Sequence, residues 1–150
     1  MKQSPDAQHL DAVLRSSALV AGGFMGDDAR RVAEVIDADA GELFRLGIER
    51  TQLADRMREI TCEATSALGT WARVGEHLEA MVDEVRGATP CPWPHEGHFP
   101  KRVTTIKRTD TGKTIRWSDL NIHMIDAHGF FEGKGSFFRL EPADLISVLF

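Results

Sequence analysis

The chain has 150 residues, of which 42% are hydrophobic and 27% charged, and its formal net charge is −5 at pH 7. These are the proportions of a water-soluble globular protein, and the length suits one core, or a core with a small appended module. The longest apolar run, ALVAGGFM, is too short to cross a bilayer and the opening MKQSPD has no apolar signal segment, so we expect a cytoplasmic protein with no membrane partner.

The first half of the chain predicts helices. Ser4 and Pro5 read as N-cap and first helical residue, so a helix is expected from there to about residue 21, before a glycine-rich turn. Apolar residues at helical spacing predict a second helix from residue 27 to 46, ended by Gly47. Thr51 caps a third, which Gly69 ends.

The segment that connects the second and third predicted helices, FRLGIERTQLADRMREI, is similar to a helix-turn-helix. A DNA-reading version would place Arg50, Gln52 and Arg56 in the major groove. Six acidic residues crowd the same region and would repel phosphate. An ordinary helical hairpin is therefore favoured over a DNA-binding regulator.

The next segments predict strands. We expect a connector over residues 71–75 and then a strand, because Leu78, Ala80 and Val82 recur at every second position, as in a strand; a helix also fits this segment. Four of the six prolines fall in residues 90–100, which predicts a stiff irregular loop over 89–100. KRVTTIKR and KTIRW then flank the turn TDTG as a β-hairpin.

A helix is expected after the hairpin, with Ser118 as its N-cap and Gly129 just past its end. Pro142 opens a last short helix. The fold class is therefore α+β: an N-terminal three-helix part, residues 1–75, packed with a small β-rich module, residues 76–150, as one compact unit that zinc can pin.

The β-rich module holds a cluster of metal-ligand side chains. Three residues separate Cys91 from His95 in the Pro-rich loop, and four separate His123 from His128 in the expected helix. Zinc prefers such thiolate and imidazole ligands in a tetrahedron. His98 is an alternative to His95 as the second ligand from this loop. The two helical histidines lie about 140° apart on an ideal helix, so both reach one metal only if the last turn loosens.

The order of a knuckle, a hairpin and a helix with a spaced histidine pair resembles the two-cysteine two-histidine zinc finger over about a quarter of the chain. One knuckle cysteine is replaced by histidine, and the hairpin insertion is roughly twice the usual twelve residues. The resemblance implies a ligand set and a ββα-like shape, without DNA reading. The metal-free alternative is a set of hydrogen-bonded histidines and a core cysteine. The other cysteine, Cys62, is far from Cys91 in sequence, so we expect no disulfide.

The charges are distributed unevenly. Residues 1–90 carry a net charge of −6 and residues 91–150 a net charge of +1. Within the hairpin, residues 101–116, six basic residues face a single acid, Asp110. This basic strip can meet a protein or an anionic partner, and nucleic acid is the less favoured partner; a solvated strand face is the simpler interpretation.

The segment GFFEGKGSFFRLEP places glycines beside Lys134, Ser136 and Arg139. Backbone N–H groups of such a loop can cradle a phosphate or carboxylate, although no Walker or dinucleotide motif is present. A turn anchored by its two phenylalanine pairs is the simpler interpretation. The same aromatic pairs can mark a contact in a homo-oligomer.

These patterns lead to three functional hypotheses. The first is a non-enzymatic, zinc-pinned adaptor that works through the basic hairpin and the Phe-flanked loop. The second is a metal-dependent hydrolase in which an open zinc site activates water, Glu96 or Asp126 is general base, and Lys134 and Arg139 hold an anionic substrate. The third is the DNA-binding regulator.

Overall fold

The computed structural model describes residues 3–150, and within them the chain forms five helices and one four-stranded antiparallel sheet. The predicted α+β class is confirmed. The helices are α1 (Pro5–Arg15), α2 (Val32–Leu46), α3 (Arg50–Thr65), α4 (Asp119–His128) and α5 (Pro142–Leu149), and the strands are β1 (Ala72–Gly75), β2 (Leu78–Pro90), β3 (His98–Arg108) and β4 (Thr114–Ser118). No helix in the described part of the chain is long and apolar enough to cross a membrane.

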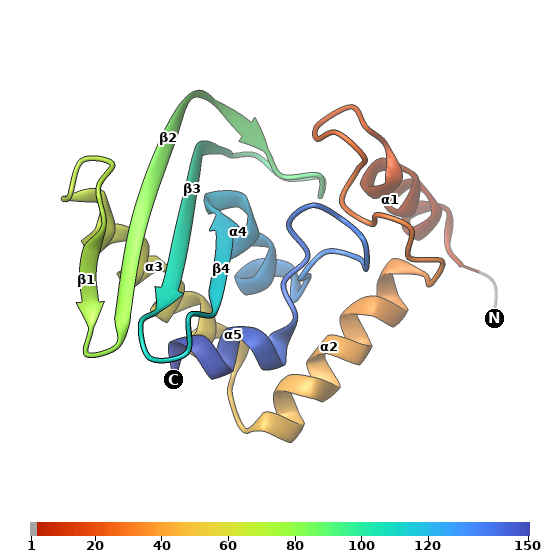
Figure 1. The fold of residues 1–150 in the computed structure, drawn as a ribbon. Coiled ribbons are helices and arrows are strands. Elements are labelled where there is room, and N and C mark those ends of the chain that lie inside the picture. Colours follow the sequence, from red (N-terminus) through yellow and green to blue (C-terminus); the bar gives the residue numbers. More distant parts are fainter. Residues whose placement is uncertain (1–2) are drawn as a thin grey trace.

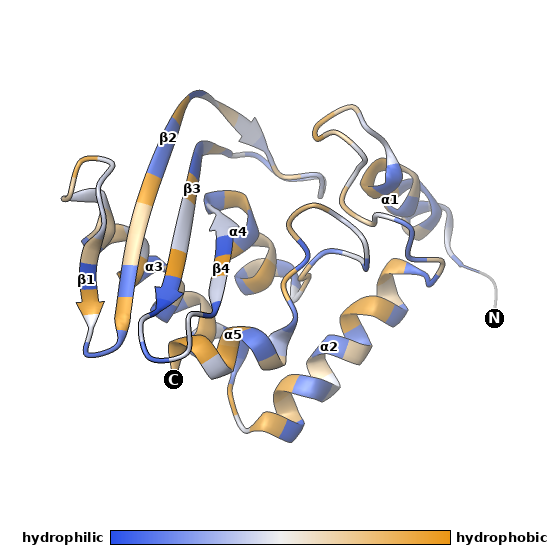
Figure 2. Ribbon diagram, viewed as in Figure 1, coloured by the Kyte–Doolittle hydropathy of each residue, from blue (hydrophilic) through white to orange (hydrophobic). Residues whose placement is uncertain are grey.

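The sheet is a simple meander in the order β1-β2-β3-β4, with long, bent β2 and β3 at its centre (Figure 1). Side chains at every second position of a strand point to the same face of the sheet. On the inner face these side chains are apolar and buried: Ala80, Val82, Ile106 and Trp117. Burial alternates along the first half of β2, and the hydropathy of its residues can be followed in Figure 2. The predicted strand after residue 76 and the predicted hairpin are both confirmed.

Helices α3 and α4 lie behind the sheet in Figure 1, and α3 packs its apolar stripe on the inner face. A buried polar contact fixes how they fit together. The indole Nε1 of Trp117 donates to Oγ1 of Thr61 at 3.0 Å, and that hydroxyl bonds to Oγ1 of Thr104 at 2.8 Å. These buried hydroxyls are therefore satisfied, which holds α3 in register with β3 and β4.

Helix α4 separates two hydrophobic clusters. Ile122 and Ile125 belong to the larger one, formed with the sheet, α3 and α5. Leu120 and Met124 belong to a smaller one, formed with α1, α2 and Cys91. Helix α4 therefore contributes side chains to both clusters.

Predicted boundaries of the first three helices are wrong. Helix α3 has Glu49 rather than Thr51 as its N-cap, and it ends at Thr65, before Gly69. Tertiary contacts explain the differences in α1 and α2. The first helix ends at Arg15, because the chain then turns back so that the backbone N–H of Phe24 donates to the carbonyl of Leu14 at 2.7 Å. The second helix begins at Val32 rather than at residue 27. The carboxylate of Asp28 accepts hydrogen bonds from Arg30 and from the backbone of residue 134, which holds residues 27–31 in a loop.

The strand boundaries also differ from the prediction. The expected connector over residues 71–75 contains β1, which pairs with β2. The expected irregular loop shrinks to residues 91–97, because β2 runs to Pro90 and pairs there with His98 at the start of β3. Pro90 and Pro100 are tolerated since they stand near strand ends, where few ladder hydrogen bonds are lost.

Candidate metal centre

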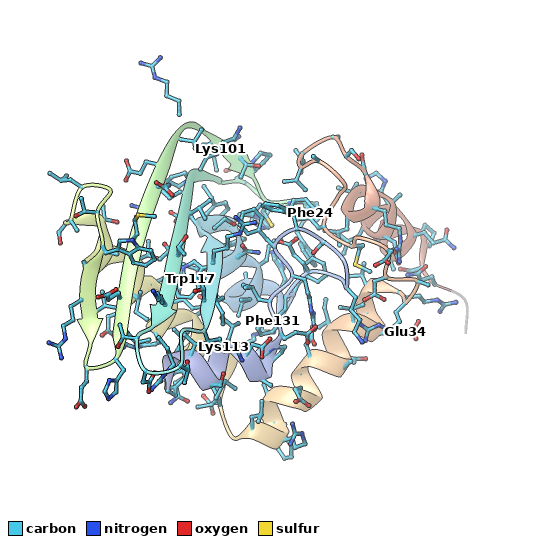
Figure 3. The ribbon with its side chains drawn as sticks, in the orientation of Figure 1. Phe24, Glu34, Lys101, Lys113, Trp117 and Phe131 are labelled. Atoms are coloured by element: carbon cyan, nitrogen blue, oxygen red, sulfur yellow. The ribbon has the colours of Figure 1, made fainter. Side chains whose placement is uncertain are left out.

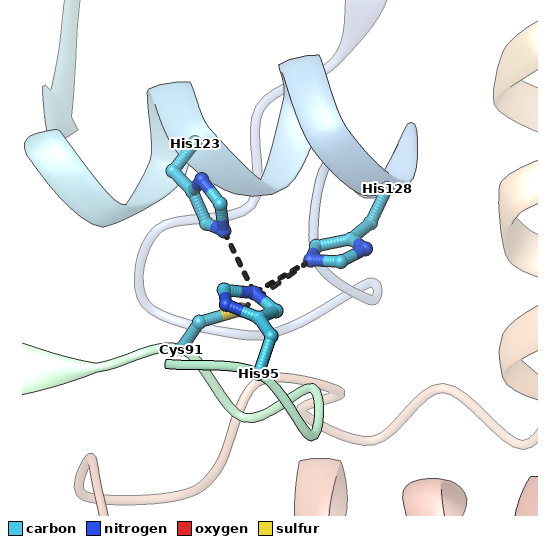
Figure 4. A group of neighbouring side chains, drawn as sticks. All are labelled: Cys91, His95, His123 and His128. Atoms are coloured by element: carbon cyan, nitrogen blue, oxygen red, sulfur yellow. Dashed lines mark hydrogen bonds between the residues drawn. The ribbon is translucent and has the colours of Figure 1, made fainter. Parts of the chain in front are cut away.

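Two segments bring the candidate ligands together. Cys91 and His95 lie in the short loop between β2 and β3, while His123 and His128 project from α4 toward that loop (Figure 4). The loop is stiff because Pro92 and Pro94 restrict its backbone, and the backbone N–H of His95 donates to the carbonyl of Trp93 at 2.9 Å. The sequence therefore presents one ligand pair from a rigid turn and one from a helix.

The donor atoms converge. Nε2 of His95 lies 3.2 Å from Nε2 of His128 and 3.1 Å from Nε2 of His123, and Sγ of Cys91 lies 3.5 Å from Nε2 of His128. All four atoms lie within 4.8 Å of one another. In a tetrahedral zinc site, neighbouring nitrogens stand about 3.3 Å apart, and nitrogen and sulfur about 3.6 Å apart. The group has the composition and the spacing to hold a metal ion.

The imidazole rings of His123 and His128 converge on one group although the last turn of α4 is regular. The sequence had led us to expect that this turn must loosen. Helix α4 continues through His128 and ends at Gly129, whose left-handed backbone (φ 65°) closes it. The N–H groups of Gly129 and Phe130 donate to the carbonyls of Ile125 and Met124, both at 3.0 Å. Imidazole side chains are long enough to span the angle between the two positions, and His95 enters between them.

Neighbouring groups orient the imidazoles. Nδ1 of His95 lies 2.8 Å from the carbonyl oxygen of Glu96, which can only accept, so Nδ1 carries the proton and Nε2 presents its lone pair to the group. The Trp93 ring stacks on His128 at a centroid distance of 4.1 Å, and Phe99 stacks on His123 at 4.3 Å. The rings of His123 and His128 are thereby held between these aromatic side chains and the other candidate ligands.

The electrostatics favour neutral imidazoles. Burial, followed by the neighbouring histidines, lowers the pKa of His128 to about 4, and burial together with His95 lowers the pKa of His123. Burial raises the pKa of the Cys91 thiol, against a backbone hydrogen bond from Trp93. A metal that binds here therefore finds His123 and His128 in the neutral form that coordinates, and must displace the proton of the Cys91 thiol.

The remaining candidate ligands lie elsewhere. His98 is outside the group, because it stands on β3 opposite Pro90 with its side chain exposed. Cys62 is an exposed free thiol on α3 and Cys91 a buried one, so the expected absence of a disulfide is confirmed. Of the two candidate general bases, Asp126 pairs with Arg58 at 2.7 Å, and Glu96 is exposed in the loop.

The candidate anion loop is fastened to the rest of the protein. The backbone N–H of Lys134 donates to Asp28 at 3.1 Å, and the hydroxyl of Ser136 donates to Glu132 at 3.1 Å. The side chain of Arg139 is only 8% exposed, and its guanidinium lies 2.6 Å from the carboxylate of Asp39. These groups are engaged within the protein, and an anion site at this loop stays a prediction.

The helical join at residues 47–49 is ordinary in its contacts. Gly47 adopts the left-handed backbone that ends α2, and α3 then buries one face against the sheet. On its outer side, Arg56 pairs with Glu59 at 2.8 Å. DNA reading by this segment also stays a prediction.

Two features escaped sequence reasoning. The stacking role of Trp93 and Phe99 was signalled only by their closeness to His95 in the sequence. A cavity of about 590 Å³ also adjoins the group: His123 lines it with Arg58, Cys62 and Arg102, and Asp119 contributes a buried carboxylate oxygen, Oδ1, that has no hydrogen-bond partner among the described residues. No motif in the sequence indicates this cavity, because its lining comes from α3, β3 and α4.

Comparison with models of protein families, with curated proteins and with solved structures finds no match to this chain.

Proposed function

We propose that the protein is a small zinc-binding interaction protein whose metal is structural. The observation that carries this proposal is the group formed by Cys91, His95, His123 and His128, whose donor atoms lie within 4.8 Å of one another. Four protein ligands complete the tetrahedron that zinc adopts in structural sites and leave no position for a reactive water. The zinc-finger resemblance in the sequence supports the same ligand set.

The metal would cross-link the β2–β3 loop and α4. The β2–β3 loop contacts α4 through the ligands, through Trp93 and Phe99, and through Cys91 in the smaller hydrophobic cluster. Because α4 contributes to both clusters, zinc would tie the far end of the sheet to the helix at their junction. Binding energy of this kind is folding energy, since the unfolded chain has no preformed site.

The surface charges support a protein partner over nucleic acid. In the basic hairpin, Arg102, Arg108 and Lys113 each pair with a carboxylate at 2.8 Å. Arg116 lies over the ring of Phe137, 4.2 Å from its centroid. Such compensated charges release few counterions from a phosphate backbone. The exposed ring of Phe137 beside Arg116 offers the type of contact that protein interfaces favour.

The cavity beside His123 favours a second candidate, a metal-dependent hydrolase. If the exposed His95 leaves the metal, water can take its place, and a substrate in the cavity would lie next to His123. Hydrolysis of ester or phosphate substrates that is lost on chelation would support this candidate. Inactivity of the zinc-loaded protein toward both classes would leave the structural role.

X-ray absorption at the zinc edge tests the coordination. We expect one sulfur at about 2.3 Å and three imidazole nitrogens at about 2.0–2.1 Å. Two imidazoles with an added oxygen would instead indicate the open, hydrolytic site. The variant His95→Ala provides the comparison, because it should show that open pattern whichever candidate is right.

A further inference from the structure

A second cavity lies away from the metal centre. It encloses about 470 Å³ between the loop after α1, the distal parts of β2 and β3, the start of α4 and the loop at residues 130–138. Phe24 and Lys101, both labelled in Figure 3, stand on two of these segments. We call it the apolar cavity, since most of its lining is hydrophobic.

The mouth of the apolar cavity gathers exposed hydrophobic side chains. Leu19, Val85 and Phe137 come from three separate segments, are 38%, 63% and 69% exposed, and all line this one cavity. Phe24 and Leu120 continue the apolar wall inward and are buried. Hydrophobic side chains that are exposed singly need no explanation, but their convergence on a cavity is typical of a site for a small apolar molecule.

A residue with a buried carboxyl group, Glu132, is also part of the cavity lining. Glu132 is only 4% exposed, and its Oε2 and Oε1 accept hydrogen bonds from the amide of Asn121 at 2.6 Å and from the hydroxyl of Ser136 at 3.1 Å. Both donors are neutral. Arg139 donates to the backbone carbonyl of Glu132 at 2.8 Å, but its charge is already balanced by Asp39. Within the described residues this carboxylate thus has no cationic partner.

Two further properties set Glu132 apart. Its backbone has a φ of 68°, a left-handed conformation that is strained for a residue with a side chain. Burial raises its pKa to about 7, against the hydrogen bonds from Asn121 and Ser136. Strained backbone and unpaired buried charge both cluster at ligand sites.

We propose that the apolar cavity binds a small molecule with an apolar body and a protonated amine, whose ammonium group pairs with Glu132. The ligand's body would cover the exposed side chains at the mouth, and its charge would supply the missing counter-ion. An anionic ligand is disfavoured. Arg102 is occupied by Asp119 at 2.8 Å, and Lys101 is exposed, where an ion pair contributes little.

A matched series of probes tests the proposal: octylamine, 1-octanol and octanoate, titrated into the zinc-loaded full chain by isothermal titration calorimetry at pH 7. Their chains are alike, so they differ only in the head group. We expect octylamine to bind at least about ten-fold more tightly than either of the others. No binding of octylamine, or a preference for octanoate, would overturn the proposal.

Two variants assign the binding to this cavity. Glu132→Gln keeps the shape of the side chain and should reduce the preference for the amine over the alcohol to less than about two-fold. Phe137→Ser, at a side chain that is 69% exposed, should weaken the binding of all three probes, whereas Phe44→Ser, at a 90% exposed phenylalanine on α2, should leave their binding unchanged. Unchanged amine binding in both Glu132→Gln and Phe137→Ser would place it elsewhere and refute the assignment.

Discussion

Replacing Glu132 by Gln should change how the stability of the protein depends on pH. The folded pKa of this carboxyl is about 7, against an ordinary value of 4.5, so the folded state holds a proton that the unfolded state has lost between these two values. The free energy of unfolding must therefore fall as pH rises through this window. Integrated from pH 5 to pH 8, the loss of unfolding free energy attributable to Glu132 is about 2 to 3 kcal/mol.

The assay is urea unfolding of the wild type and of Glu132→Gln at pH 5, 6, 7 and 8, with zinc present throughout. The difference between the two proteins isolates Glu132, because all other groups titrate alike in both. Relative to the variant, the wild type should lose about 2 to 3 kcal/mol across the range. Glu63→Gln, at an exposed position on α3, should follow the wild type. A constant difference between wild type and Glu132→Gln from pH 5 to 8 would refute the reasoning.

Three other substitutions should lower the stability of the folded protein by stated amounts. Arg139→Ala leaves the carboxylate of Asp39, only 5% exposed, without its partner, and should lower the free energy of unfolding by about 3 to 5 kcal/mol in urea melts; a change below 1 kcal/mol would contradict this. Trp117→Phe removes the indole hydrogen bond to Thr61 and should cost about 1 to 3 kcal/mol by the same assay. Gly26→Ala would place a Cβ atom against the backbone of residues 134–136 at a φ of 58°, so its melting temperature should fall by several degrees, whereas an unchanged value would show that the loop yields freely.

Local signals in the sequence were sufficient for the β-hairpin and for α4. Alternating residues on either side of a glycine turn determine the hairpin, and Ser118 with Gly129 determines the helix, since the N-cap side chain and the left-handed C-terminal residue act over only a few positions. The limits of α1 and α2 were not predictable in the same way. They depend on Phe24 and Asp28, whose partners lie on other segments.

The residue types of the candidate ligand group were predictable from the sequence. Which histidines belong to it, and how their rings converge, were not. Residue type and spacing singled out five candidates, but choosing His95 over His98 required the pairing of His98 with Pro90, a long-range register that no local pattern encodes. The angle between His123 and His128 on an ideal helix also gave too strict a test, because it describes the positions of Cβ atoms rather than the reach of the imidazole rings. The stacking of aromatic side chains on these rings, and both cavities, arise only from the packing of distant segments.

The metal content of the purified protein tests the central claim most directly. Elemental mass spectrometry of protein prepared without chelator should find about one zinc per chain in the wild type, in Cys62→Ser and in His98→Ala, because these two controls change the same residue types outside the ligand group. Cys91→Ser and His123→Ala should lose most of the zinc, with lower melting temperatures. A wild type without zinc, or ligand variants that retain it, would contradict a structural zinc site.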